Sequence, residues 1–311
     1  MESPTVRPFY VLREVRRSLV GFFLTLFLLP CQAGEVVFAA YNVRNYLITD
    51  VVDAEGVVRQ PAKPEKQIAA VLQVVQHTRP DILGIVEMGD ESALHDFQAR
   101  LKAQGIDLPH HEWLRGADPS RHLALLSRFP IERRDSIDDV LFDLDGRPER
   151  MARGILDVTL LLPGDKRLRV MGAHFKSRRP VPGVDDRAMR VLEAWHLRKK
   201  MTEALQGEAP VPLLVFGDFN DYKNEAPIRE IIGVPGNPLH MRDLPLTDGQ
   251  GEKWTFYWQE SDLYSRIDYL FASQALWKNI LLPKSGIVDI PPWSEASDHR
   301  AIYTTIQTDD L

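Results

Sequence analysis

Cysteine is almost absent from this sequence. Of the 311 residues, only Cys31 is a cysteine. A single cysteine cannot form an internal disulfide, and this one lies in a segment that an exported chain would lose. Packing alone must therefore hold the mature fold together.

The sequence also has no hydrophobic run long enough to cross a bilayer comfortably. Its apolar run near the N-terminus, Ser18–Pro30, has 13 residues, and a membrane helix needs about 20. Three arginines at positions 13, 16 and 17 precede the run, and CQAG follows it, with Cys31 and Ala33 at the small-residue positions of a cleavage site. This order is typical of a secretory signal peptide.

We therefore expect residues 1–33 to be a signal peptide and residues 34–311 to be the mature domain. An uncleaved anchor and a lipid-modified Cys31 are the alternatives, and Pro30 in front of the cysteine disfavours the second. After cleavage no stable membrane span would remain. The expected location is extracytoplasmic, either secreted or periplasmic.

Basic charge is not in excess. The whole chain has a net charge of −6. Loss of residues 1–33 removes four basic and two acidic residues, which leaves 34 basic and 42 acidic residues and a net charge of −8. A protein that coats nucleic acid without specificity would be basic, so this class is disfavoured. An enzyme with a locally basic cleft remains compatible with the composition.

Repeats, low-complexity tracts and convincing linkers are missing as well. The composition, 44% hydrophobic and 26% charged residues, is ordinary for a globular protein and leaves enough apolar side chain for a large core. Strand-like runs alternate with helical patterns, which indicates one α/β domain with two largely antiparallel or mixed sheets and helices on the outer faces. The expected strands are 35–43, 81–88, 123–131, 154–162, 168–175, 211–216, 255–259, 266–272 and 301–306.

Apolar residues at helical spacing predict the helices between these strands. A helix over 64–78 would bury Ile68, Val71, Leu72 and Val75, and a second, with Asp90 as its N-cap, would bury Leu94, Phe97 and Leu101. A third helix over 185–205 is expected to bury Ala188, Val191, Leu192 and Trp195. A short helix is expected near 225–232.

Polar residues recur where the expected strands end. The stretch GDFND, residues 217–221, directly follows the apolar run 211–216. Because alternate strand residues share a face, Asp218 and Asn220 should project to the same side. Carboxylate and amide oxygens from several strand ends suit Mg²⁺, Mn²⁺ or Ca²⁺ better than zinc. The series is Asn42, Glu87, His174, Asp218, Asn220, Asp268, Asp298 and His299.

Each of these residues has a simpler explanation when taken alone. An asparagine after a strand usually forms a turn, a glutamate at a strand end is usually solvated, and Ser-Asp-His can cap a helix or form a turn. Their order along the chain favours a shared site over a set of separate turns.

The chain resembles the endonuclease/exonuclease/phosphatase superfamily, which has the DNase I-like fold, and looks like an exported bacterial-type nuclease within it. The resemblance implies a four-layer α/β sandwich with two facing mixed β-sheets flanked by helices. It also implies a divalent metal, Mg²⁺ with Mn²⁺ or Ca²⁺ as alternatives, and hydrolysis of a phosphate ester. The matching motifs, in order, are AAYNV, ILGIVEM, GAHFKS, VFGDFND, SRIDYLFAS and ASDHRAI.

The resemblance assigns roles to the acidic and amide residues. Glu87 would be the main metal ligand, with Asn42 and Asp298 near the same ion. Asp218 would orient or deprotonate the attacking water, and Asn220 would bind a phosphate oxygen or the nucleophile. Which group is the formal base is left open.

The same resemblance assigns roles to two histidines. Asp268 would pair with His299, which would fix the tautomer of the ring and favour the imidazolium. His174 would face the phosphate as a second electrophile or acid. Metal, imidazolium and carboxylate together would neutralise the phosphate, aim the water and stabilise the leaving alkoxide.

Substrate-binding residues are harder to predict. Lys176, Arg178 and Arg179 follow His174 and form a local basic patch, which either grips phosphates or is a solvated loop. Arg153 is at a position where related nucleases often bind phosphate, although a surface arginine beside a strand is an equal alternative. The aromatic residues Trp254, Phe256, Tyr257 and Trp258 either stack on bases or pack in the core.

We expect a metal-dependent phosphodiesterase, a nuclease that acts on DNA or RNA and is a monomer. A sphingomyelinase-like phospholipase or a phosphomonoesterase of the same fold is the alternative, and a noncatalytic binding module is a third hypothesis. The inositol polyphosphate 5-phosphatase branch is disfavoured, because YSRIDY stands where that branch has a PAWCDR-like motif.

Overall fold

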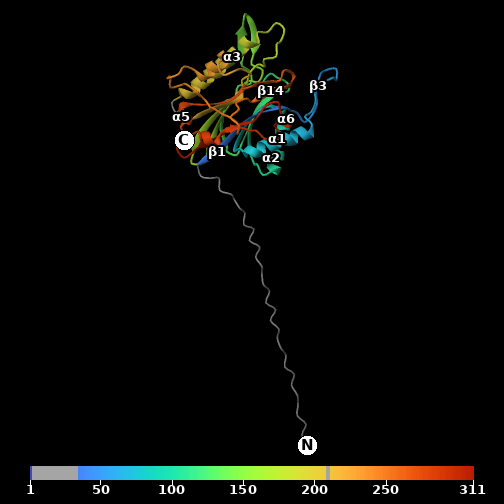
Figure 1. The fold of residues 1–311 in the computed structure, drawn as a ribbon, viewed down its shortest axis with the longest axis vertical. Helices are drawn as coiled ribbons and strands as arrows, with labels where there is room; N and C mark the ends of the chain where they lie inside the picture. Colours follow the sequence, from blue (N-terminus) through green and yellow to red (C-terminus); the bar gives the residue numbers. More distant parts are fainter. Residues whose placement is uncertain (2–33, 208–210) are drawn as a thin grey trace. The chain divides into compact units, whose positions relative to one another are not determined.

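The computed structural model describes residue 1, residues 34–207 and residues 211–311. Gly34–Leu311 forms one compact unit, and Figure 1 shows its sheets and helices. The predicted signal peptide and its cleavage site fall outside the described residues, so both stay predictions. Within the described ranges, no helix combines the length and apolar character that crossing a membrane requires.

The first sheet is mixed, with strand order β17-β18-β1-β4-β6-β5. Its central pair, β1 and β4, is parallel, and β18, β6 and β5 pair antiparallel with their neighbours. The first and last of its long strands along the chain lie side by side. The strands are β1 (Glu35–Tyr46), β4 (Ile82–Met88), β5 (His110–Leu114), β6 (His122–Ser127), β17 (Gly286–Ile287) and β18 (Ile302–Gln307).

The second sheet is also mixed, with order β13-β16-β12-β11-β10-β7. The pair of β11 and β12 is parallel. The strands are β7 (Ile131–Arg134), β10 (Ile155–Leu162), β11 (Lys166–His174), β12 (Leu213–Asp218), β13 (Arg242–Asp243) and β16 (Asp268–Ala272). Three hairpins stand apart from the sheets: β2 (Val51–Val52) with β3 (Val58–Gln60), β8 (Leu141–Leu144) with β9 (Arg147–Arg150), and β14 (Phe256–Trp258) with β15 (Leu263–Ser265).

Three apolar clusters define the layers. One contains inward residues of both sheets, such as Val86 and Leu214, and therefore lies between them. A second joins the other face of the first sheet to α1 (Glu65–Thr78) and α2 (Glu91–Ala103), and a third joins the second sheet to α3 (Asp186–Leu205) and α4 (Ala226–Ile232). The predicted four-layer α/β sandwich is confirmed. The remaining helices are α5 (Gln274–Trp277) and α6 (Trp293–Ala296), with single 3₁₀ turns at Gln259–Ser261 and Leu282–Lys284.

The two sheets approach closely around one aromatic ring. Phe216 of β12 is fully buried, and its ring lies against Gly84 of β4 and Gly172 of β11. A Cβ atom at either glycine would come within 2.5 Å of that ring, far closer than the roughly 3.5–4.0 Å of ordinary carbon contacts. Because Gly84 and Gly172 have no side chain, the Phe216 ring has space between them.

The first two helices are as predicted. Ile68, Val71, Leu72 and Val75 of α1 are buried, and so are Leu94, Phe97 and Leu101 of α2. Asp90 caps α2, since its carboxylate accepts the backbone N–H of Ala93 at 2.9 Å.

The prediction for the buried face of α3 is wrong. Trp195 is 49% exposed, and Ala188, Val191 and Leu192 are only partly buried. The buried face instead carries two charged residues, Arg190 and Glu193, together with Met189, Ala194, Leu197 and Met201.

Hydrogen bonds explain why this charged face is inside. Arg190 Nε donates to Asp221 Oδ2 at 3.0 Å, and Glu193 Oε2 accepts the backbone N–H of Lys176 at 2.7 Å. Buried charges are tolerated when they are paired in this way. Burial nevertheless raises the pKa of Glu193 to about 7, against the opposing effect of the Lys176 N–H and of Arg153 and Arg190.

Substitution of the two glycines tests the close approach of the sheets. We expect Gly84→Ala and Gly172→Ala each to lower the free energy of unfolding by about 1–3 kcal/mol, because the added methyl overpacks the Phe216 ring. Gly249→Ala is the control, since a Cβ there meets nothing within 4 Å. Urea unfolding measures the three variants. Equal stabilities for all three would show that the Phe216 ring can make room for an added methyl at no cost.

The raised pKa of Glu193 predicts a loss of stability as the pH rises. Between the usual value of 4.5 and about 7 the folded state keeps a proton that the unfolded state has released, so unfolding becomes easier with increasing pH. Relative to Glu193→Gln, the wild type should lose roughly 3 kcal/mol between pH 4 and pH 8. Urea unfolding across this range measures the difference. The exposed Glu203→Gln on the same helix is the control and should parallel the wild type, and a pH-independent difference for Glu193→Gln would contradict the assignment.

Candidate active site

Polar side chains from both sheets meet at one edge of the sandwich. Asn42 is the last residue of β1 before its pairing with β4 shifts register, and Glu87 lies near the end of β4. In the second sheet, register places His174 of β11 and Asp268 of β16 on either side of Asp218 of β12. His299 comes just before β18 and forms an isolated bridge with Phe256. The fold thus brings together residues that lie as far apart in the sequence as Asn42 and His299.

Two neighbouring carboxylates of the second sheet, Asp218 and Asp268, both face the imidazole of His299, which lies just before β18 of the first sheet. His299 Nδ1 lies 2.8 Å from Asp268 Oδ2, and its Nε2 lies 3.6 Å from Asp218 Oδ2. All three side chains are buried. Burial by itself lowers the pKa of His299, but the carboxylates of Asp268 and Asp218 outweigh it and raise the pKa to about 10. The ring is therefore an imidazolium at neutral pH.

Asp218 is the point where most of these groups converge. Its Oδ2 accepts a hydrogen bond from Asn42 Nδ2 at 3.1 Å and lies 3.6 Å from His174 Nε2. Burial raises its pKa to about 8, with His299 opposing and Asp268 adding to the rise. A raised pKa makes the ionised form of this carboxylate a stronger base, which suits the role of a general base.

The turn after β12 divides GDFND into two halves with different surroundings. Asn220 has a left-handed backbone, φ 51°, and its N–H donates to Asp218 Oδ1 at 3.0 Å while its side chain donates to the carbonyl of Phe175 at 3.1 Å. Asp221 instead faces away from the cluster and pairs with Arg190 and Arg178. Asp218 and Asn220 thus belong to the candidate site, and Asp221 belongs to the packing beneath it.

Glu87 is held in an unusual backbone conformation. Its φ is 61°, and the pairing of β4 with β6 shifts register between Val86 and Met88, around it. Left-handed backbone at a residue other than glycine is costly, and such strain is concentrated at functional sites. The carboxylate accepts the backbone N–H of Asn45 at 3.2 Å, and its other oxygen lies 3.9 Å from His174 Nε2.

His174 lies between the carboxylates of Glu87 and Asp218. Burial, together with the positive charges of Arg153 and His299, lowers its pKa well below the usual value, so the ring is neutral. Its Nδ1 is buried and has no hydrogen-bond partner among the described residues. A group from outside the chain can therefore complete its hydrogen bonding.

The donor set fits a divalent cation with a preference for oxygen. Glu87 offers a carboxylate that is 17% exposed, and Asn42 offers an amide oxygen that already accepts the N–H of Arg44 at 3.0 Å. Asp298 is 27% exposed and lies 3.6 Å from Arg44 Nε, at the rim rather than inside the cluster. Asp218, Asp268 and His299 also have ligand atoms within 4.8 Å of one another, but the raised pKa of His299 disfavours it as a ligand, because a ligand must give up its proton.

The predicted substrate-binding residues are mostly engaged with acidic partners. Lys176 pairs with Asp186 at 2.8 Å, and Arg153 pairs with Asp118 at 2.9 Å. Arg178 pairs with Asp221, and its guanidinium stacks on the ring of Tyr222 at 4.3 Å. Arg179 is exposed. Their role in substrate binding stays a prediction, and Arg179 has the fewest competing contacts among the four in the described structure.

Sequence reasoning also missed basic residues near the site, among them Arg121 and Lys63. Arg121, in the loop before β6, has its Nε 3.6 Å from Glu87 Oε2. Lys63 is buried and donates to the carbonyl of Arg44 at 3.2 Å, and burial lowers its pKa to about 8. Neither follows a long apolar run, so the search for polar residues at strand ends could not find them.

The aromatic residues at 254–258 divide between packing and exposure. Phe256 lies against the ring of His299, with centroids 4.8 Å apart, and Trp254 lies under the guanidinium of Arg300 at 4.1 Å. Tyr257 stacks on Tyr264 at 4.5 Å. Trp258 is 40% exposed and Tyr264 is 51% exposed. The β14–β15 hairpin thus presents aromatic surface beside the candidate site.

The chain is similar to several solved structures. TDP2 from Caenorhabditis elegans in truncated form is 19% identical, with 88% of this chain and 98% of that chain covered and a TM-score of 0.59. The human Nocturnin catalytic domain with bound sulfate anion is 18% identical (88% and 94% covered, TM-score 0.61). An endonuclease/exonuclease/phosphatase from Bacteroides vulgatus is 17% identical (88% and 99% covered, TM-score 0.61).

At these identities the solved structures show the shared fold alone. No curated protein matches the sequence. The model of the Endonuclease/Exonuclease/phosphatase family matches residues 39–299, which include each of the residues that meet at the sandwich edge. The chain therefore belongs to the endonuclease/exonuclease/phosphatase family of phosphoric ester hydrolases.

Proposed function

We propose that this protein is a divalent-metal-dependent phosphodiesterase, an exported nuclease that hydrolyses DNA or RNA by in-line attack of water. The observation that carries the proposal is the convergence on Asp218 of an amide and two imidazoles, with the carboxylate of Glu87 close by. This set offers a base, a cationic hydrogen-bond donor and oxygen ligands within one buried cluster.

Hydrolysis of a phosphodiester needs charge neutralisation, a positioned water and a stabilised leaving group. A divalent cation, Mg²⁺ by preference, would supply Lewis acidity at the phosphate oxygens when bound by Glu87, Asn42 and Asp298. The ionised carboxylate of Asp218, whose basicity is increased by burial, would take the proton from the attacking water. Asn220, whose backbone N–H donates to Asp218, would use its side chain to orient the same water or a phosphate oxygen.

The two histidines would act in different protonation states. His299 is an imidazolium held by Asp268, so it can donate a hydrogen bond to a phosphate oxygen as negative charge develops. His174 is neutral and buried, so one ring nitrogen can donate a hydrogen bond without bringing charge. The opposite pKa shifts of the two rings give two distinct donors at one phosphate.

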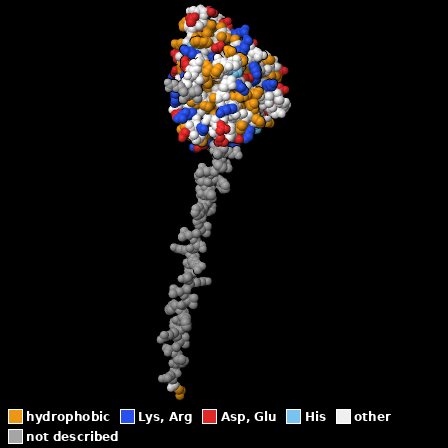
Figure 2. All heavy atoms as spheres, turned by 90° about the vertical axis from the view of Figure 1, so that its left-hand side faces the viewer, with side chains coloured by type: hydrophobic (Ala, Val, Ile, Leu, Met, Phe, Trp, Pro, Cys, Tyr) orange, Lys and Arg blue, Asp and Glu red, His pale blue; other side chains and the backbone are white. Residues whose placement is uncertain are grey.

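A polyanionic substrate is favoured by the basic residues around the cluster. Arg44 is 55% exposed and pairs with Asp298, and Arg121 is 29% exposed and lies near Glu87. Figure 2 shows basic, acidic and hydrophobic side chains interspersed on the face in view, so any attraction for phosphates depends on such local groups. Export rests on the predicted signal peptide, residues 1–33, and the monomeric state stays a prediction.

The β14–β15 hairpin supports a second candidate function. Trp258, Leu263 and Tyr264 are all at least 40% exposed, and the hairpin reaches the site through the contact of Phe256 with His299. Aromatic surface of this kind stacks on bases in single-stranded nucleic acid, and it also binds the interface of a lipid bilayer. A sphingomyelinase-like phospholipase is therefore the alternative.

Two aspartates of the same turn should separate chemistry from stability. We expect Asp218→Asn to lower kcat about 10²–10⁴-fold, the range for loss of a general base, with little change in the stability of the metal-free protein. Asp221→Asn should instead cost about 3–5 kcal/mol, because it leaves Arg190 buried without its partner, and should keep kcat near the wild type well below its Tm. Steady-state kinetics and urea unfolding measure the pair. The reverse pattern would place the reacting group at Asp221.

A substrate panel tests the proposed function itself. Protein treated with a chelator should be inactive, and Mg²⁺ should restore cleavage of DNA or RNA. KM for nucleic acid should rise steeply with salt, because binding of a polyanion releases counterions. The panel should include duplex and single-stranded DNA, RNA, sphingomyelin vesicles and a soluble phosphate monoester. Turnover of sphingomyelin without turnover of nucleic acid would establish the alternative, and no turnover of any substrate would indicate a binding module.

A further inference from the structure

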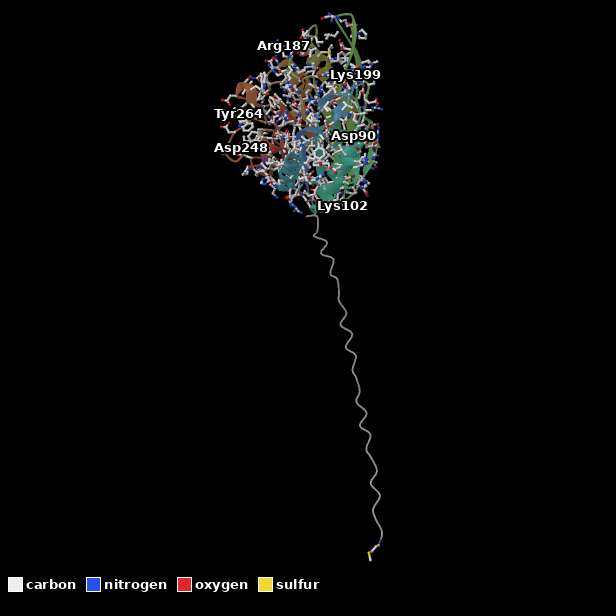
Figure 3. The ribbon with its side chains drawn as sticks, turned by 90° about the vertical axis from the view of Figure 1, so that its right-hand side faces the viewer. Asp90, Lys102, Arg187, Lys199, Asp248 and Tyr264 are labelled. Atoms are coloured by element: carbon white, nitrogen blue, oxygen red, sulfur yellow. The ribbon has the colours of Figure 1, made fainter. Side chains whose placement is uncertain are left out.

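A second cluster of metal-ligating side chains lies away from the candidate active site. Glu91 and His95 of α2 and His111 of β5 each place one ligand atom within 4.8 Å of the other two. None of the three belongs to the buried cluster at the sandwich edge. Figure 3 shows α2 at the surface, with the labelled residues Asp90 and Lys102 near its two ends.

The secondary structure brings these three residues together. Glu91 and His95 are four residues apart, so they lie on the same face of α2, one turn apart. His111 pairs with Leu126 in the register of β5 with β6, and Leu126 belongs to the apolar cluster that packs against α2. Because paired residues of neighbouring strands share a face, His111 also faces the helix. The helix α2 and the strand β5 therefore place these three side chains next to one another, between the helix and the sheet.

The distances are close to those of a bound ion. The rings of His95 and His111 meet edge to face with centroids 5.1 Å apart, and His111 Nε2 is 4.0 Å from Glu91 Oε1. Around a tetrahedral zinc ion the ligand atoms are about 3.4 Å apart, given metal–ligand bonds of roughly 2.0–2.2 Å. Glu91 and His95 are exposed and His111 is partly exposed, so small rotations of the side chains close the difference.

The nearest cation does not form an ion pair with the three proposed ligands. Arg134, the cation beside His111, pairs with Glu112 at 2.9 Å, and Glu112 lies on the opposite face of β5. A metal binds the neutral form of an imidazole, and the rings of His111 and His95 lie against each other without an arginine or lysine between them in the described structure.

We propose that Glu91, His95 and His111 form a surface site for a transition-metal ion of the Zn²⁺ type, separate from the active site. Two imidazoles and one carboxylate, with water as a fourth ligand, suit Zn²⁺, Ni²⁺ or Cu²⁺ and discriminate against Mg²⁺ and Ca²⁺, which prefer oxygen. The ion joins the first turns of α2 to the edge strand β5. It thereby restrains the segment that begins four residues after Glu87.

Zinc titration of the full chain without a polyhistidine tag tests the proposal. In excess Mg²⁺, calorimetry should show one equivalent of Zn²⁺ that is lost in His95→Ala and in His111→Ala. Glu91→Gln should weaken its binding. His110→Ala is the matched control, because His110 is the next residue of the same strand and faces the other side, and it should keep the equivalent.

A second measurement separates this site from the catalytic one. Zn²⁺ should raise the Tm of the wild type and of His110→Ala, and this increase should be smaller in His95→Ala and His111→Ala. Mg²⁺-dependent hydrolysis should be unchanged in all of these variants, which also shows that they fold. The proposal is overturned if neither His95→Ala nor His111→Ala loses an equivalent of Zn²⁺. That outcome would leave the proposed function of the active site unaffected.

Discussion

The spacing of the two sheets decides whether a site can form at their edge. Phe216 fills the gap between Gly84 and Gly172, and the site follows within three residues on each of these strands, at Asp218, Glu87 and His174. Several contacts of the site cross from one sheet to the other, such as Asn42 to Asp218 and Glu87 to His174, and His299 reaches Asp268 and Asp218 from the segment before β18. Protein interiors pack too densely for the distance between the sheets to vary freely. The core therefore fixes the distances between the site residues of the two sheets.

The two aspartates of the turn after β12, Asp218 and Asp221, differ in how their charge is balanced by neighbouring groups. The charge of Asp221 is balanced by Arg178 and Arg190. Both of its carboxylate oxygens are engaged by these arginines, so they are not available to bind a ligand. Asp218 shares a single imidazolium with Asp268 and is otherwise surrounded by neutral donors, so burial raises its pKa. Incomplete compensation is typical of functional sites, because a bound cation or substrate then completes it.

Much of the fold was predictable, because a strand or helix with one buried face has apolar residues at a regular spacing in the sequence. The faces of α1 and α2 and the position of Asp218 at a strand end follow from periodicity alone. The face of α3 does not, because Arg190 and Glu193 are buried through partners from distant segments, Asp221 and Lys176, while Trp195 is exposed. The hairpin β8–β9 and the residue Arg121 were missed for a related reason. The strand β8 has only four residues and β9 is mostly polar, and Arg121 does not follow an apolar run, so only the tertiary structure places them.

The pairing of β1 with β18 has a consequence for synthesis. In the first sheet β18 lies between β17 and β1, so β1, the earliest strand to be made, presents an open edge until residues 302–307 exist. Open edges invite pairing with other chains. His299 also lies in this last stretch, so completion of the sheet and completion of the site coincide. Until residues 299–307 have been made, a nascent chain of this protein therefore lacks both the antiparallel neighbour of β1 and one side chain of the candidate site, and the free edge of β1 can pair with other chains.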